Sequence, residues 1–193
     1  MKLAAYVAMV IWICVPYFLL GRLPIRTPDV MPMTAIDRAI EFNPAWTIVY
    51  VSLYLLMPLA AIFDTSRGRI MRYVIALAIT SGIASVIFLI WPSAIARPPL
   101  TEAPLLYSII RQIDSPLNAC PSLHASFAVL AALAFEARRL LRIAVWTWVM
   151  LILYATLSTR QHVLIDLVAG IALACVVWIF VRGIYDTRRS GNL

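Results

Sequence analysis

Six long apolar runs divide the chain. A helix that crosses a membrane needs about 20 predominantly apolar residues, with a range of roughly 17 to 25, and the fourth and fifth runs are at the short end of that range. Since backbone groups in lipid must be hydrogen-bonded within the protein, runs this long and continuous predict helices and not barrel strands. The pattern therefore predicts an all-α, polytopic membrane helix bundle with about six transmembrane helices. The runs cover Leu3–Leu20, Ala45–Phe63, Met71–Pro92, Pro121–Ala137, Leu141–Leu157 and His162–Arg182.

The first run follows Lys2, as the apolar part of a secretory signal peptide would. It is longer than such a segment usually is, and the Leu19–Pro24 stretch that follows offers no cleavage site with small residues. We expect a retained membrane anchor.

Two of the connections are long and rich in proline, Gly21–Pro44 and Ser93–Cys120. In the first, apolar and charged residues alternate between Met33 and Phe42 with a spacing that predicts a short amphipathic helix on the membrane surface. In the second, we expect Arg111 and Asp114 to lie in a solvated loop.

Composition supports a membrane protein. The chain has 193 residues, of which 63% are hydrophobic, whereas soluble domains contain about 45–50% apolar residues. The length predicts one integral membrane domain over residues 1–193, with a catalytic core at about residues 71–182. The three cysteines have no paired spacing, so we expect neither a disulfide framework nor a zinc motif.

The net charge of +7 is distributed unevenly over the connections. Six spans put both termini on one side, where ten basic and three acidic residues lie, while the other side has six of each. Basic residues favour the cytoplasmic side, so we predict cytoplasmic termini and two long loops on the periplasmic, extracellular or lumenal side. The basic residues are not interleaved with aromatic residues in a polar patch, which argues against nucleic acid as a partner.

The only two histidines, His124 and His162, fall at the non-cytoplasmic ends of predicted helices. Asp166 follows His162 by four residues, so on a helix the two share one face, and the carboxylate can fix the imidazole tautomer. An oriented neutral imidazole is a competent nucleophile or base, and the second histidine can protonate a leaving oxygen. We therefore predict His162, Asp166 and His124 as catalytic residues.

Phosphate is the electrophile that best fits these residues. Arg97 and Arg160 lie on the same predicted side, and guanidinium groups match phosphate oxygens. Pro121-Ser122 opens the fourth predicted helix, where backbone N–H groups can bind an anion. Arg97, Ser122 and Arg160 are thus candidate phosphate-binding residues.

At this point the sequence resembles the type 2 phosphatidic acid phosphatase superfamily, also called lipid phosphate phosphatases. Arg97-Pro98 is similar to the end of that family's first motif, and Pro121-Ser122-Leu123-His124 to its second motif, Pro-Ser-Gly-His. His162 and Asp166 have the spacing of the third. The resemblance extends over roughly residues 34–170, and Pro-Ser-Leu-His with Gln-His-x-x-x-Asp is closest to the branch that contains inositol phosphorylceramide synthases.

The sequence departs from the family pattern at three positions. Leu123 replaces the glycine of the second motif, Ile90 the lysine of the first, and Thr156 the arginine of the third. Arg160, two residues before His162, is a candidate to replace that arginine's charge.

The resemblance implies a division of roles. The third-motif histidine, His162, would attack phosphorus and form a phosphohistidine, with Asp166 orienting it and His124 protonating the leaving alcohol. It also implies that no metal or other cofactor is required. The substrate would be a phospholipid, polyprenyl or sphingolipid phosphate in the membrane, and either water or an alcohol would accept the phosphoryl group.

Three other functions fit the residues. One is a serine protease that uses Ser122 or Ser126 with His162 and Asp166, although the chain lacks a Gly-x-Ser-x element. Another is a transporter in which the His162–Asp166 pair relays protons. The third is a metal site built from both histidines and Asp166.

Overall fold

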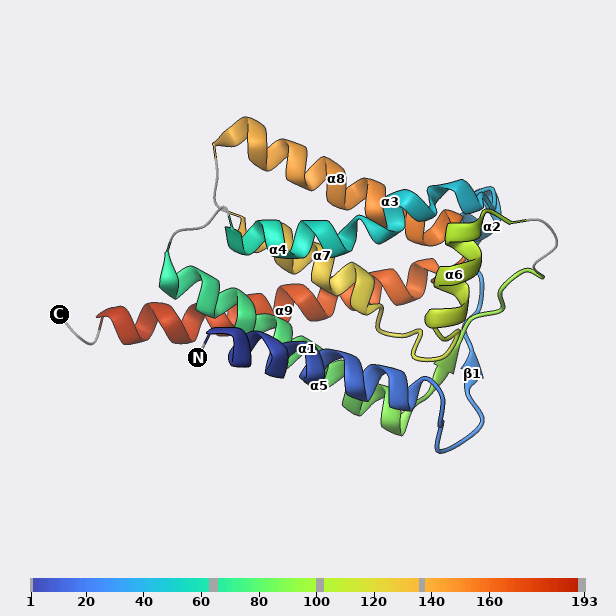
Figure 1. The fold of residues 1–193 in the computed structure, drawn as a ribbon, viewed down its shortest axis with the longest axis horizontal. Helices are drawn as coiled ribbons and strands as arrows, with labels where there is room; N and C mark the ends of the chain where they lie inside the picture. Colours follow the sequence, from blue (N-terminus) through green and yellow to red (C-terminus); the bar gives the residue numbers. More distant parts are fainter. Residues whose placement is uncertain (1, 63–65, 100–102, 136–137, 191–193) are drawn as a thin grey trace.

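A computed structural model describes residues 2–62, 66–99, 103–135 and 138–190 of the chain. These residues form a bundle of long helices that is closed at one end by short elements (Figure 1). The prediction of an all-α membrane bundle is confirmed. The helices are α1 (Lys2–Leu20), α2 (Ala35–Ala39), α3 (Thr47–Val51), α4 (Leu53–Ile62), α5 (Arg67–Ile90), α6 (Leu105–Ile113), α7 (Leu123–Ala134), α8 (Arg139–Ser158) and α9 (Leu164–Ser190), with a 3₁₀ turn, η1, at Pro44–Trp46.

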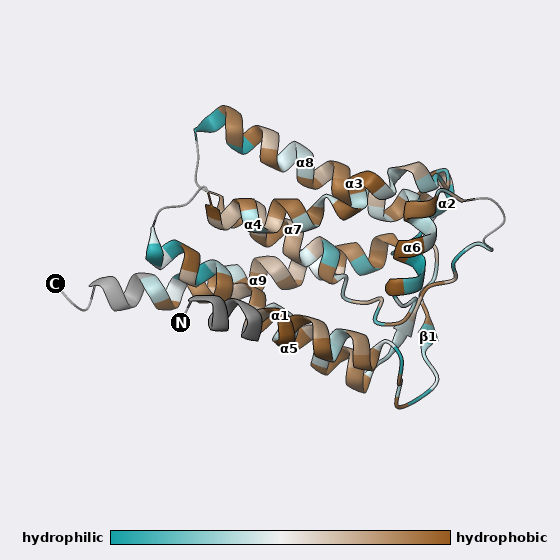
Figure 2. Cartoon of the chain, in the orientation of Figure 1, coloured by the Kyte–Doolittle hydropathy of each residue, from teal (hydrophilic) through white to brown (hydrophobic). Residues whose placement is uncertain are grey.

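Each predicted apolar run coincides with helical structure. Within the described residues, four helical segments are long and apolar enough to cross a membrane, namely Pro44–Ile62, Arg67–Ile90, Arg139–Ser158 and Leu164–Tyr185. Two shorter apolar helical segments are Met9–Leu20, which is part of α1, and α7. The helices are mostly hydrophobic along their length, and hydrophilic residues gather chiefly at the helix ends and connections (Figure 2). The predicted run ends at Phe63 and Ala137 lie outside the described residues.

The short helix α7 is the centre of the bundle and packs against α4, α5, α8 and α9. Nearly all of its side chains are buried, and many are alanine. Small side chains allow helix backbones to approach closely, which in lipid is a main source of helix association. His124, in its first turn, is therefore held inside the protein.

The second predicted span is not one continuous helix, because α3 ends and α4 begins around Ser52. The Ser52 hydroxyl donates to the Val49 carbonyl at 2.6 Å and accepts from the Trp148 indole of α8 at 2.8 Å. The interruption is thus stabilised by polar contacts, and Tyr50 lies just before it.

Both long connections meet at one end of the bundle. Strand β1 (Asp29–Val30) pairs in parallel with β2 (Ser93–Ala94), and Ala94 also forms a bridge with Leu117. Helix α6 crosses this end steeply, while both termini lie at the opposite end (Figure 1). The side of the membrane on which the termini lie stays a prediction.

The predicted short helix between Met33 and Phe42 is present as the five-residue α2, in which Ile36 is exposed and Asp37 is fully buried. The expectation for the second connection needs correction. Arg111 lies not in a solvated loop but in the amphipathic helix α6, whose Leu105, Ile109 and Ile113 are exposed. The apolar spacing Leu105, Ile109, Ile113 in the sequence is the signal that would have found it.

Candidate active site

Both histidines line one cavity of about 110 Å³ at the end of the bundle where the long connections meet. Their ring centroids lie 6.5 Å apart, and both side chains are largely buried, with 8% of His124 and 7% of His162 exposed. Asp114 also lines the cavity. The other walls are mostly apolar and come from α1, α4, α6 and α7, including Ile13, Phe18, Leu53, Ile110, Ile113 and Phe127.

His162 and Asp166 lie close together, although not in the predicted way. Helix α9 begins at Leu164, so His162 precedes the helix instead of opening it. Its Nδ1 lies 3.4 Å from Asp166 Oδ2, which also accepts from the Val163 backbone N–H at 3.1 Å. The fully buried carboxylate thus caps the start of α9 and faces the imidazole at once.

The turn before His162 explains the late start of α9. Helix α8 ends with Arg160 in a left-handed conformation, φ 54°, and with backbone bonds from Arg160 to Leu157 and from Gln161 to Thr156. This is the Schellman arrangement, in which glycine is the usual left-handed residue. Residues 161–163 therefore separate this turn from the start of α9.

The Arg160 side chain anchors this turn. Its guanidinium donates to the carbonyls of Asp37 at 2.7 Å and Ile40 at 2.6 Å, and so joins α2 to the α8–α9 turn. Arg160, like the other predicted phosphate-binding residues Arg97 and Ser122, is not among the described residues that line the cavity. Sequence reasoning missed this contact because its partners are main-chain atoms about 120 residues away in the chain.

Asp37 contributes a second anchor that sequence reasoning missed. One carboxylate oxygen accepts from the Thr34 N–H and hydroxyl at 2.7 Å, and the other accepts from the Leu164 N–H at 2.8 Å. A carboxylate at the first N–H groups of a helix is favourable for hydrogen bonding and for the helix dipole. Asp37 therefore holds the beginning of α9, and with it His162, against α2.

Ser122 joins the two histidine-bearing segments. Its hydroxyl caps α7 by accepting from the Ala125 N–H at 3.3 Å, and its own N–H donates to the Asp166 carbonyl at 3.0 Å. The Ser126 hydroxyl donates to the Gly170 carbonyl at 2.8 Å. A Cβ at Gly170 would lie 2.3 Å from the Ser122 carbonyl oxygen, so only glycine permits this approach of α9 to α7.

Aromatic rings surround His124. The Tyr50 ring stacks on the imidazole with centroids 4.0 Å apart and an angle of 13°, and Tyr54 approaches edge-on at 5.8 Å. Such packing fixes the ring plane of the imidazole.

Asp114 lies at the site and not in the solvated loop that we expected. Burial by itself raises the pKa of its carboxyl group, but His124 and the hydroxyls of Tyr17 and Tyr50 outweigh burial and hold the pKa below its usual value. Asp114 therefore carries a negative charge at neutral pH.

Arg97 lies next to this carboxylate. Its guanidinium donates to the carbonyls of Asp114 at 2.6 Å and Ser115 at 3.1 Å. The structure thus brings Arg97 to the loop that borders the cavity, whereas it directs the terminal nitrogens of Arg160 to α2.

Several buried polar atoms around the histidines have no hydrogen-bond partner within the described part of the chain. They are His124 Nε2, Asp166 Oδ1, Arg97 Nε and both amide atoms of Gln161. Buried polar groups in folded proteins are nearly always bonded, so a concentration of unbonded ones indicates a site that a polar ligand completes.

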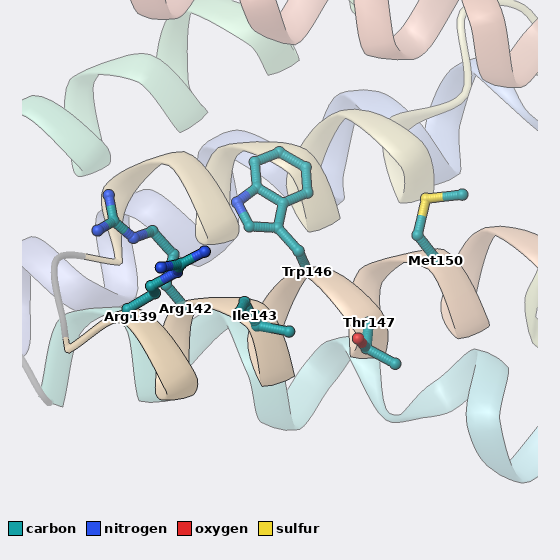
Figure 3. A pocket seen from close by; sticks show the side chains of 6 residues that line it. All are labelled: Arg139, Arg142, Ile143, Trp146, Thr147 and Met150. Atoms are coloured by element: carbon teal, nitrogen blue, oxygen red, sulfur yellow. The ribbon is translucent and has the colours of Figure 1, made fainter.

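A wider groove, with a volume of about 530 Å³, lies along the first half of α8, away from the histidines. Arg139 and Arg142 lie at one end of it and Met150 at the other (Figure 3). Among the described residues that line it there is no histidine, cysteine or carboxylate. Among the residues with described positions, no three His, Cys, Asp or Glu side chains are grouped as metal ligands would be.

Comparison with known proteins agrees with this arrangement. The sequence model of the PAP2 superfamily matches residues 29–180, which include both histidines and Asp166. No curated protein and no solved structure matches the chain. Because the matched region covers well over half of the chain, this protein is a member of the PAP2 superfamily, a family of phosphatases and phosphotransferases that act on phosphate esters.

Proposed function

We propose that this protein is a membrane lipid phosphatase or phosphotransferase that cleaves a lipid phosphate ester or pyrophosphate through a phosphohistidine on His162. The observation that carries the proposal is the composition of the cavity. Two histidines and a carboxylate line one part of it, and apolar side chains of four helices line the rest. An amphiphile whose phosphate is attached to an apolar chain matches both parts.

In the first half of the reaction, His162 is the nucleophile and His124 is the general acid. Asp166 faces Nδ1 of His162, so Nε2 of His162 is the atom that attacks phosphorus. As the Nε2–P bond forms, the bond from phosphorus to the lipid oxygen breaks, and His124 gives its Nε2 proton to that oxygen.

The second half regenerates the enzyme. His124, now neutral, takes a proton from water or from an alcohol, whose oxygen attacks phosphorus and displaces His162. Phosphate or a new phosphate ester leaves, and both histidines return to their starting protonation states.

Candidate phosphate ligands remain Arg97, Ser122 and Arg160. Arg97 has the strongest support, because its Nε is buried and has no bonding partner in the described structure. The terminal nitrogens of Arg97, like Ser122 and Arg160, now bond backbone groups and would have to exchange these bonds to reach a phosphate.

The substrate class follows from the cavity walls. We propose a phosphatidic acid-like, polyprenyl or sphingolipid phosphate, with its tail between α1, α4 and α6 and its head group under the two long connections, on the non-cytoplasmic side. Head-group transfer, as in inositol phosphorylceramide synthases, is the second candidate, since two largely buried histidines in a mostly apolar cavity give bulk water restricted access.

Purified protein in detergent tests the proposal. Phosphate release from a panel of lipid phosphates and pyrophosphates would be measured with a chelator present, and His162→Ala would serve as the control. We expect release by the wild type and a loss of at least about a thousandfold in the variant, because removal of a nucleophile eliminates the covalent route.

An absence of release from every lipid would contradict the hydrolase. Transfer of a labelled head group to an added lipid alcohol would then establish the phosphotransferase. If transfer also failed and proteoliposomes showed pH-coupled flux, the proton-coupled transporter would replace both.

A further inference from the structure

Asp114 and two tyrosines connect three elements beside His124. The Tyr17 hydroxyl of α1 donates to Asp114 Oδ1, and the Tyr50 hydroxyl of α3 donates to Asp114 Oδ2, both at 2.5 Å. The same Tyr50 oxygen lies 3.2 Å from His124 Nδ1. A continuous path therefore runs from a carboxylate through a phenol to the second histidine.

The direction of each proton follows from the donors and acceptors. A carboxylate only accepts, so the Tyr50 proton points to Asp114, and the Tyr50 oxygen can only accept from Nδ1–H of His124. The tautomer with hydrogen on Nδ1 is thereby selected. Nε2 of His124 is buried and has no partner in the described structure, which leaves it for a reacting group.

We propose that Asp114, acting through Tyr50, is a positioning residue that fixes the tautomer of His124 and stabilises its protonated form. The inference rests on the proposed function and deepens it, because it assigns each histidine its own carboxylate. Asp166 faces His162 directly, whereas Asp114 reaches His124 through a phenol.

A general acid must carry a proton on the nitrogen that faces the leaving group. With Nδ1–H bonded to Tyr50, a proton on Nε2 makes the ring an imidazolium, which needs a nearby negative charge inside the protein. Asp114 supplies it, and Arg97 holds the backbone carbonyl of that residue.

The other ionisable groups near His124 do not supply this charge. They are Cys14 and Tyr17 from α1, Tyr54 from α4, His162 before α9, and Arg97 after β2. Among the described residues around His124, Asp114 is therefore the anion, since the carboxylate of Asp166 is paired with His162.

Two tyrosine variants separate a positioning role from a merely structural one. Tyr17→Phe and Tyr50→Phe each remove one 2.5 Å bond to the same carboxylate, but only Tyr50→Phe breaks the path to His124. For phosphate release from the best lipid substrate, we expect the alkaline limb of the pH profile to move to lower pH by about one unit in Tyr50→Phe and Asp114→Asn. In Tyr17→Phe, the alkaline limb of the pH profile should stay at the wild-type pH. Equal movement in both tyrosine variants would overturn the proposal.

A measurement without turnover tests the same path. The chain has only two histidines, so nitrogen NMR of histidine-labelled protein contains two rings, and His162→Ala assigns them. We expect the Nδ1–H tautomer for His124 in the wild type and in Tyr17→Phe, and its loss in Tyr50→Phe. An unchanged His124 spectrum in Tyr50→Phe would overturn the inference even if the enzyme hydrolyses lipids. An absence of lipid turnover would contradict only the proposed function.

Discussion

Arg160 occupies a backbone conformation that normally favours glycine. Its φ of 54° lies in the left-handed region, which costs a side-chain-bearing residue about 1–2 kcal/mol. The guanidinium bonds to the Asp37 and Ile40 carbonyls offset this cost and place the turn that leads to His162.

Two substitutions of Arg160 separate strain from anchoring. Arg160→Ala and Arg160→Gly both lose the guanidinium bonds, but only glycine relieves the backbone. We expect both variants to be less stable than the wild type, and Arg160→Ala to be less stable than Arg160→Gly by about 1 kcal/mol, as measured by thermal unfolding in detergent. The opposite order of the two variants would contradict strain at this position.

Gly170 lies where α9, which carries Asp166, approaches α7, which carries His124. In Gly170→Ala, the new methyl would overlap the Ser122 carbonyl, and we expect a loss of about 1–3 kcal/mol in thermal unfolding, as for other overpacked sites. Gly183→Ala is the matched control on the same helix, because within the described structure no atom outside that helix's own backbone lies within 4 Å of its Cβ position. An equal loss of thermal stability in Gly170→Ala and Gly183→Ala would contradict a tight contact between Gly170 and the Ser122 carbonyl.

The contribution of Asp114 to the thermal stability of the protein depends on pH. Because its pKa is lowered in the folded state, its contribution to stability is present above the ordinary value of about 4 and is lost as pH falls through the lower folded value. The difference in thermal stability between wild type and Asp114→Asn should therefore be full at pH 6 and should shrink only below about pH 4. A difference that already shrinks between pH 7 and pH 5 would contradict this sign.

Residue spacing found the His162–Asp166 pair and the position of His124, because both depend on short stretches of sequence. It did not find Tyr50, Tyr17 and Asp114. Their contacts join residues 64 to 97 positions apart, and no local pattern encodes such distances.

Among the elements, α1 provides one wall of the cavity. Ile13, Cys14, Tyr17 and Phe18 of this helix line the space next to the histidines. If the lipid tail occupies that space, the side chains of α1 influence which tails fit.

Filling the cavity from α1 tests this role. Ile13→Trp adds an indole to a space of about 110 Å³, and we expect turnover of a long-chain lipid phosphate to fall at least about tenfold while a short-chain analogue is still processed. Ile11→Trp is the control, because Ile11 is 54% exposed on the same helix. An equal loss for both chain lengths would contradict a tail site at α1.

The apolar runs predicted the long helices well, because spanning helices need continuous apolar sequence. The short elements were less predictable. The β1–β2 pair has two residues in each strand, and its register depends on where two distant connections meet. Helix α6 lies in a proline-rich connection, for which we expect a solvated loop, although the spacing of its apolar residues is helical.

At the level of the whole molecule, both termini lie at the end of the bundle opposite to α6 and β1 (Figure 1). The histidines share a cavity with Ile110 and Ile113 of α6. The excess of basic residues predicts that the end with the termini faces the cytoplasm. The charge pattern thus predicts that the proposed reaction takes place on the opposite side.

Cysteine labelling in intact cells tests this orientation. In a background without native cysteines, Thr27→Cys in the first long connection should react with a membrane-impermeant maleimide, because that end is predicted to face outward. Gly68→Cys, at the open start of α5 near the termini, should react only after the membrane is permeabilised. The reverse pattern would invert the topology.

The PAP2 match begins at residue 29, after the end of α1, whereas the cavity and the Tyr17 contact to Asp114 both depend on α1. The proposed reaction groups and part of the proposed tail site therefore lie in different stretches of the sequence. Exchange of one N-terminal helix for another is then a route by which evolution, or an engineer, can change the preferred lipid without rebuilding the catalytic centre.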